Sequence, residues 1–441
     1  MEGVSDRVVR RVESMRQEIE EMASSLIRVE SVNPKYVGVV YADVLGGESD
    51  ASRFMGKLYA EAGATVDLFA AEPGRENAVG VIGGSGGGRS LIFNGHVDVV
   101  PVGVNEDWSD GAPFSGRIDR DRIWGRGACD QKCGVVGQAM AVTALRRENI
   151  RLKGDLILEA VVGEEVMDHE AGVSATIDRG YRADGAIVSE PTGPPDTLSV
   201  VPISPGLLWF AVTVRGKASH ASVRDEMIRA GGGGSDVAVS AIEKGLIVVE
   251  TLQRLEDEWG RSKRHPLFKP GHFTIHPGVI QGGPSGVAVP FIISQYCTIE
   301  YACWFHPDED VDAVKEELGA ELERGCAIDP WLRANPPSIE WKLHWPSFST
   351  SMEDPIVGVV EDAHKLVTGD GSSVKGSHVA GFCAVCDATF LSKAGMSTVV
   401  YGPGSVLQAH TVDEWVDKED VVTAVKTYAV AALTWCGEEG S

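Results

Sequence analysis

The most telling part of the sequence is SLIFNGHVDVV, residues 90–100, an apolar, β-rich run with turn-forming residues on both sides. The same pattern returns in DLILEAVVG (155–163) and in GAIVSE (185–190). Unbroken apolar runs of this length are typical of strands buried on both faces of a parallel sheet. Since a helical segment, AVTALRREN (141–149), lies between the first two runs, the pattern predicts βαβ alternation and an α/β fold.

Acidic or imidazole side chains stand at the end of each of these strands. His96 and Asp98 close the first run, the pair Glu164 and Glu165 follows the second, and Glu190 closes the third. We expect these side chains to lie close together, because ligands bind at the carboxyl ends of the strands in open parallel sheets. Two adjacent carboxylates at the end of a buried strand would repel one another unless a cation holds them.

Two further candidates lie beside glycine-rich turns. Asp130 stands in WGRGACDQK (124–132), and His410 follows YGPGSVLQA (401–409). Two histidines and four carboxylates suit two divalent metal ions that lie about 3.5–4 Å apart and share a bridging carboxylate, with one carboxylate left as a proton carrier. We assign the bridge to Asp130, although an aspartate beside glycine is more often a turn former or a helix cap. Zinc, manganese and cobalt suit such ligands alike.

The texture of the sequence changes in residues 203–347. LLWFAVTVRG (207–216) alternates like a half-exposed strand, and residues 236–259 have the spacing of a long helix. We expect 203–347 to be an inserted α+β domain. Because a helix-strand-helix pattern resumes after it, residues 1–202 and 348–441 are expected to form one discontinuous catalytic domain.

Composition excludes several classes of protein. With 43% apolar and 24% charged residues, the 441-residue chain is that of a globular protein with a sizeable core. A formal charge of −24 leaves no basic surface for nucleic acid or for a membrane. The eight cysteines form no framework, and neither a signal peptide nor an apolar run of about 18 residues is present, so we expect a cytoplasmic protein.

Taken together, the motifs resemble the di-metal amidohydrolases and exopeptidases that include acetylornithine deacetylase, succinyl-diaminopimelate desuccinylase, aminoacylase and glutamate carboxypeptidase. The resemblance covers nearly the whole chain, in order and in spacing. It rests on GHVDVVPVG (95–103), GRGACDQKCG (125–134), GEE (163–165), EPT (190–192), GKASHAS (216–222) and GPG (402–404) with a later HTVDE (410–414). It implies a zinc-exopeptidase-like catalytic domain with a mixed, mostly parallel sheet. It also makes 203–347 a lid or dimerisation domain, through which the protein would form a homodimer.

The resemblance further implies a ligand set for each of two divalent metal ions. His96, Asp130 and Glu190 would bind one ion, and Asp130, Glu165 and His410 would bind the other. Imidazole and carboxylate are ligands of the kind that such ions use.

Three more residues receive catalytic roles. Asp98 would orient His96, and its position two residues along an extended segment places both side chains on one face. Glu164 would be the general base, taking a proton from metal-activated water and returning it to the leaving amine. His220 would polarise the oxygen of the scissile group, in its own or in the partner active site.

The sequence departs from the family pattern at two places. Trp304 and Phe305 stand where relatives usually carry an arginine before a proline, and Thr389 stands where an arginine commonly follows an aspartate. Those arginines typically grip a substrate carboxylate with a forked pair of hydrogen bonds, which neither Trp nor Thr can replace. We therefore expect a small substrate with an aromatic ring in contact with Trp304 and Phe305, although Trp304 is equally well explained as part of the lid core.

Any anion contact would then come from Arg224, Lys217 or His378. Thr389 is kept as a further candidate for substrate contact.

The sequence thus predicts a metal-dependent hydrolase of the amidohydrolase or deacylase type that cleaves a C–N bond in a small molecule. Two alternatives use the same site: hydrolytic deamination of an electron-poor aryl amine, and a metallo-exopeptidase of the dipeptidase or carboxypeptidase type. A non-catalytic binding protein on the same fold is the alternative of another class, and the presence of every ligand position and of Glu164 argues against it.

Overall fold

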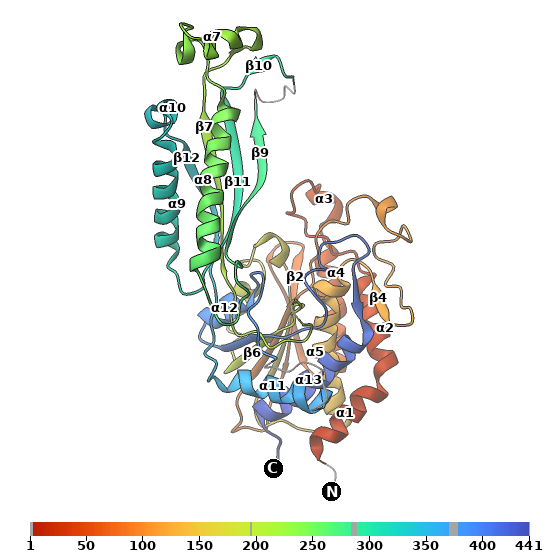
Figure 1. The fold of residues 1–441 in the computed structure, drawn as a ribbon. Helices are drawn as coiled ribbons and strands as arrows, with labels where there is room; N and C mark the ends of the chain where they lie inside the picture. Colours follow the sequence, from red (N-terminus) through yellow and green to blue (C-terminus); the bar gives the residue numbers. More distant parts are fainter. Residues whose placement is uncertain (1–2, 195, 284–288, 370–377, 441) are drawn as a thin grey trace. The chain divides into compact units, whose positions relative to one another are not determined.

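The computed structural model describes residues 3–194, 196–283, 289–369 and 378–440 (Figure 1). The chain divides into two compact units. Unit 1 comprises Met1–Ile203 and Phe348–Ser441, and unit 2 comprises Ser204–Ser347.

Unit 1 is built on a six-stranded sheet in the order β1-β2-β5-β3-β6-β13. The strands are β1 (Thr65–Glu72), β2 (Arg75–Ile82), β3 (Leu91–His96), β5 (Leu156–Val161), β6 (Gly185–Val188) and β13 (Ser397–Val400). The pairs β3–β5, β3–β6 and β6–β13 are parallel, whereas β1–β2 and β2–β5 are antiparallel. The predicted mixed, mostly parallel sheet of an α/β protein is confirmed.

Helices cover both faces of this sheet, which explains the unbroken apolar runs of its central strands. Along β3, Leu91 and Phe93 face one core cluster and Ile92 faces the other. The first cluster takes side chains from α1, α2, α4, α5, α11 and α13, and the second from α6 and α12. The helices of unit 1 are α1 (Val4–Ser14), α2 (Arg16–Ile27), α3 (Tyr41–Val44), α4 (Gly47–Glu61), α5 (Cys133–Arg147), α6 (Val173–Asp178), α11 (Pro355–Thr368), α12 (Ala388–Lys393) and α13 (Lys418–Cys436).

Two short strands lie apart from the main sheet and matter for the site. β4 (Arg122–Trp124) and β14 (Trp415–Asp417) pair in antiparallel register, with Trp415 opposite Trp124. They bring together the segment that precedes Asp130 and the segment that follows His410.

Unit 2 is an antiparallel sheet in the order β12-β7-β11-β9, with α8 packed on one face. Along β11 the residues alternate between buried and half-buried, as expected for a sheet that has one covered face. The expected helix 236–259 begins later, at Ala241, because the Ser240 hydroxyl caps it by accepting from the Glu243 amide. The elements are β7 (Gly206–Arg215), β8 (Ser219–His220), α7 (Arg224–Ile228), α8 (Ala241–Ser262), β9 (Thr274–Gly282), β10 (Ile292–Ile293), β11 (Tyr296–Phe305), α9 (Val311–Cys326), α10 (Pro330–Ala334) and β12 (Ser338–Trp345).

Within the described ranges, none of the helices combines the length and the apolar character that crossing a bilayer requires.

Candidate metal centre

The carboxyl ends of three adjacent parallel strands converge on one imidazole. His96 is the last residue of β3 and is fully buried. Its Nε2 lies 3.2 Å from Asp130 Oδ1, 3.7 Å from Glu190 Oε1 and 3.8 Å from Glu164 Oε2. Donor atoms of His96, Glu164 and Glu190, and likewise of His96, Asp130 and Glu165, lie within 4.8 Å of one another. Residues up to 94 positions apart in the sequence therefore share one site.

Asp130 lies between the two histidines. Its Oδ1 faces His96, and its Oδ2 is 3.3 Å from His410 Nε2. The same His410 nitrogen is 2.9 Å from Glu165 Oε2. A carboxylate whose two oxygens face two different imidazoles has the geometry required of a ligand that bridges two cations.

The second nitrogen of His96 is held by Asp98, although differently from the sequence prediction. His96 Nδ1 is 2.9 Å from the backbone oxygen of Asp98 and 3.5 Å from its Oδ1. The Asp98 Oδ2 accepts hydrogen bonds from Asn33 Nδ2 (2.8 Å) and from the Glu165 amide (3.1 Å). Asp98 thus fixes the ring of His96 and also ties the end of β3 to the turn that carries Glu165.

Carboxylates outnumber the imidazoles of the site, so negative charge is in excess there. Burial and the nearby Asp130 carboxylate raise the pKa of Glu190 well above its ordinary value, and they raise the pKa of Glu165 to about 7. Burial likewise raises the pKa of Glu164 well above its ordinary value. Burial alone would lower the pKa of His410, but hydrogen bonds to Asp130 and Glu165 raise it to about 11. The clustered carboxylates therefore favour bound protons or other cations.

One buried oxygen supports a metal rather than protons alone. Glu165 Oε1 is buried and has no hydrogen-bond partner. A buried polar atom without a partner is costly in a folded protein, so a ligand is expected to satisfy it. Two imidazoles among several carboxylates form a donor set that fits divalent metal ions.

The turn that carries Glu164 and Glu165 is anchored by a buried guanidinium. This segment, residues 163–168, is called the acidic turn below; the Asp168 amide closes it by donating to Gly163 O (2.8 Å). Arg75 is fully buried, and its Nη1 is 2.5 Å from Asp168 Oδ2. The same guanidinium contacts Glu48 through Nε (2.6 Å) and Nη2 (2.8 Å).

Two of the candidates for substrate contact belong to unit 1. Thr389 is fully buried in α12, and the His378 ring is 4.6 Å from the ring of His364. Their roles stay predictions.

The remaining candidates belong to unit 2 and already have partners there. His220 Nδ1 is 2.8 Å from Ser222 Oγ, and Arg224 Nη2 is 2.5 Å from Glu243 Oε1. Lys217 donates to the backbone oxygen of Asp236. The assignment of His220 to oxyanion stabilisation stays a prediction.

The two aromatic candidates differ from one another. Trp304 is half-buried, on the sheet face that alternates with the buried residues of β11. Phe305 is 2% exposed, and its ring occupies the space that a Cβ atom at Gly206 would need. A contact between substrate and Phe305 would therefore require this ring to move.

Sequence reasoning missed several residues that complete the site. Gln131 donates to Glu190 Oε1 (2.6 Å), and its place directly after Asp130 was a usable signal. Asp387 is buried, neither of its carboxylate oxygens has a hydrogen-bond partner, and its charge contributes to the raised pKa of Glu164. Asn33 carried no signal, because only the fold brings it to Asp98.

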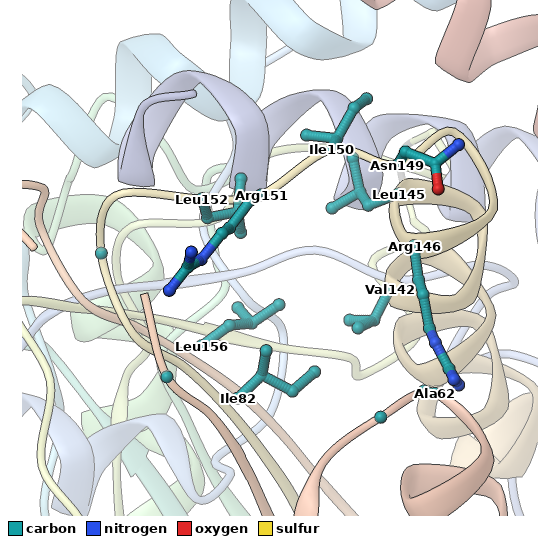
Figure 2. Close-up of a pocket in the computed structure, with 13 residues that line it drawn as sticks. Ala62, Ile82, Val142, Leu145, Arg146, Asn149, Ile150, Arg151, Leu152 and Leu156 are labelled. Atoms are coloured by element: carbon teal, nitrogen blue, oxygen red, sulfur yellow. The ribbon is translucent and has the colours of Figure 1, made fainter. Parts of the chain in front are cut away.

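A pocket of about 410 Å³ lies apart from this centre, beside the first residue of β5 (Figure 2). Apolar side chains, among them Ile82, Val142 and Leu156, surround it, and Arg146 and Arg151 supply its charged groups. None of its lining residues is acidic or a histidine, so the ligand cluster and this pocket are separate features.

Known proteins resemble this chain along most of its length. The model of a family described as "Peptidase family M20/M25/M40" matches residues 92–434. N-formyl-4-amino-5-aminomethyl-2-methylpyrimidine deformylase of Bacillus subtilis is 32% identical over 98% of this chain and 97% of its own. The enzyme of the same name from Halalkalibacterium halodurans is 32% identical over 88% of this chain and 89% of its own. Acetylornithine deacetylase of Myxococcus xanthus is 29% identical over 82% of this chain and 84% of its own.

Solved structures agree on the fold. An M20 family metallo-carboxypeptidase from Sulfolobus solfataricus superposes with a TM-score of 0.65 over 94% of this chain and 98% of its own, at 18% identity. Aminopeptidase PepT from Bacillus cereus superposes with a TM-score of 0.67 over 95% of this chain and 99% of its own, at 17% identity.

Proposed function

The chain belongs to peptidase family M20/M25/M40, and from its similarity to two deformylases we propose that it is itself a deformylase, which removes the formyl group from the amine of a small heteroaromatic compound. In its broader class the protein is a metal-dependent hydrolase of C–N bonds, as the sequence predicted. The deformylase assignment rests on 32% identity to two enzymes of that name, in one case along 98% of the chain.

The departures from the family pattern support this substrate class. Trp304 and Thr389 stand where a carboxylate-binding arginine is expected. The compound named for both relatives, an N-formyl aminomethylpyrimidine, carries no carboxylate for such an arginine to grip. Loss of the guanidinium and an uncharged aromatic substrate are thus consistent with one another.

The residues of the centre fit two divalent ions. We assign His96, Asp130 and Glu190 to one ion, and Asp130, Glu165 and His410 to the other. When bound, such ions would make water a stronger acid and would stabilise negative charge on the formyl oxygen.

The chain itself moves the proton. Glu164 takes a proton from the attacking water, whose oxygen forms a bond to the formyl carbon, and it returns that proton to the amine nitrogen as the C–N bond breaks. The products are formate and the primary amine. His220 is assigned to the oxyanion.

Unit 2 supports a homodimer. On α8, Ile242 and Leu246 are 43% and 58% exposed, and on the edge strand β9, Val279 and Ile280 are 49% and 51% exposed. An exposed apolar strand edge invites pairing with another chain, and a second copy offers the same surface. Leu246→Glu should then yield monomers in analytical ultracentrifugation.

All eight cysteines are free, which suits the reducing cytoplasm that we propose as the location of the protein.

The deciding experiment compares substrates on metal-reconstituted enzyme. N-formyl-4-amino-5-aminomethyl-2-methylpyrimidine and the N-acetyl compound on the same ring are assayed beside N-acetylornithine, a dipeptide and a simple aryl amine. We expect the formyl compound to have the highest kcat/KM, measured as formate released, and a chelator to abolish its turnover. Faster hydrolysis of the aliphatic substrates would refute the proposal, and ammonia released without formate would favour deamination.

A further inference from the structure

Glu414 organises the backbone around Asp130. Its Oε1 accepts hydrogen bonds from the amides of Cys129 (2.9 Å) and Asp130 (3.1 Å). Its Oε2 accepts from the Gly127 amide (3.0 Å) and from Arg126 Nη1 (2.6 Å). Glu414 is fully buried and Arg126 is 3% exposed. One carboxylate therefore binds four donors of a single segment, residues 125–130, called the aspartate turn below.

The aspartate turn needs an acceptor of this kind. The amides of Gly127, Cys129 and Asp130 point inward there, and Gly127 adopts a φ of +85°, which glycine tolerates better than other residues. Buried amides without acceptors are costly, and a carboxylate can accept several hydrogen bonds at once. Arg126 offsets the negative charge that Glu414 brings into the interior.

Glu414 also links this turn to a distant part of the chain. It stands four residues after His410, and its backbone oxygen accepts from the Gly125 amide (2.9 Å). The next residue, Trp415, begins the pairing of β14 with β4. A few residues before His410, the Ser405 oxygen accepts from Cys129 Sγ (3.2 Å). Contacts on both sides of His410 thus join its segment to the aspartate turn.

We propose that Glu414 is a positioning residue that fixes the carboxylate of Asp130 relative to the imidazole of His410. These two side chains come from sequence positions 280 residues apart, and each must hold its place if both are to bind the same cation. Glu414 accepts hydrogen bonds from the amides of Asp130 and of the residue before it, and it stands four positions after His410 in the chain. The inference depends on the metal centre proposed above, but not on the identity of the substrate.

The test is the affinity of Glu414→Gln for Co²⁺ in calorimetric titrations of the metal-free protein. A glutamine side chain keeps one oxygen but turns an NH₂ group toward Gly127 and Arg126, both of which are donors. Because Asp130 is assigned to both ions, we expect both binding events to weaken by about 10–100-fold, the range typical when a group that orients metal ligands is removed. The absorption spectrum of the Co²⁺ form should change, and kcat should fall more than KM rises.

The matched control is Glu20→Gln. Glu20 is also a buried carboxylate of unit 1, 7% exposed, and it contacts the Lys418 ammonium at 2.8 Å. If Glu414 has only a structural role, both variants should lose stability alike and leave both Co²⁺ affinities unchanged. That result would overturn the proposal.

Glu414→Asp keeps the inference testable if Glu414→Gln does not fold. It retains the charge opposite Arg126 but is one methylene shorter, so it cannot reach all four donors. We expect faster amide hydrogen exchange at Cys129 and Asp130, together with weaker Co²⁺ binding. Unchanged exchange and unchanged affinity would refute the role of Glu414. Failure of the wild-type protein to bind Co²⁺ would instead refute the metal centre itself.

Discussion

The aspartate turn and the acidic turn both present ligands to the same centre, yet they are anchored by opposite charges. In the aspartate turn the backbone amides point inward, so the anchor is an anion, Glu414. In the acidic turn a side-chain carboxylate, Asp168, points inward, so the anchor is a cation, Arg75. The polar groups that each turn points inward, amides in one and a carboxylate in the other, thus decide the charge of the buried partner. The two anchors should therefore fail differently when they are removed.

The largest expected effect separates chemistry from anchoring within the acidic turn. Glu164→Gln should lower kcat by about 10²–10⁴-fold, the usual contribution of a general acid or base, because an amide cannot carry the proton. The acidic turn should keep its place, since the Asp168 to Gly163 hydrogen bond is untouched. Metal content by elemental analysis and kcat on the formyl substrate check both statements.

The control for this substitution is Glu170→Gln, just beyond the same turn, whose carboxylate is 72% exposed. It should leave kcat within about twofold of wild type, because an exposed carboxylate outside the centre has no role in proton transfer. Full activity in Glu164→Gln would remove that residue as the base.

The next effect breaks the cationic anchor. Arg75→Met should cost about 3–5 kcal/mol in the free energy of unfolding, because it leaves the buried Glu48 without its cation and Asp168 with only the ammonium of Lys35. Arg53→Met is the matched control: Arg53 is 51% exposed, and its contact with Glu76 should be worth at most about 1 kcal/mol. Urea denaturation of the metal-free proteins measures both. Equal losses in the two variants would mean that Arg75 is not an anchor.

This comparison also marks the limit of what the sequence could predict. The strands β3, β5 and β6 and the residues at their ends were predicted, because apolar runs and the side chains that close them are local features. The anchors were not predicted. Arg75 contacts a residue 93 positions away, and Glu414 contacts residues 284 to 288 positions away. A single charged residue in sequence is usually a surface residue.

The helix start of α8 shows the same limit at short range. Residues 236–240 have the spacing of a helix, but the local hydrogen bond made by the Ser240 hydroxyl begins the helix at Ala241. The strand β2 was missed because Glu76 and Asn77 interrupt its apolar pattern. In the fold, Asn77 is buried and donates to Ala171 O (2.8 Å), a contact that only the tertiary structure supplies.

A smaller effect is expected when the contact between Arg75 and the acidic turn is weakened while Arg75 itself stays. Asp168→Asn removes the charge that faces Arg75 but leaves the two contacts of Arg75 with Glu48. We expect kcat/KM to fall by about tenfold, the lower end for groups that orient metal ligands, with a stability loss of about 1–3 kcal/mol. Lys35→Met removes the other cation on the same carboxylate oxygen, at 2.8 Å. Because Lys35 is 39% exposed, its loss should matter less; the reverse order would place the anchor at Lys35.

The smallest expected effect is a dependence of the unfolding free energy on pH that comes from Glu72. We expect it for the cationic anchor only, because Glu72 contacts Arg75. Burial alone would raise the pKa of Glu72, but hydrogen bonds from Lys35, Tyr41 and Arg75 lower it to about 2. Since this folded-state value lies below the ordinary 4.5, the stabilisation is complete above pH 4.5 and is lost as pH falls toward 2. The unfolding free energy of wild type should therefore decrease more steeply over this window than that of Glu72→Gln. Because other carboxylates titrate there in both proteins, the difference between the two curves isolates Glu72, and parallel curves would show that its contacts to the anchor contribute nothing.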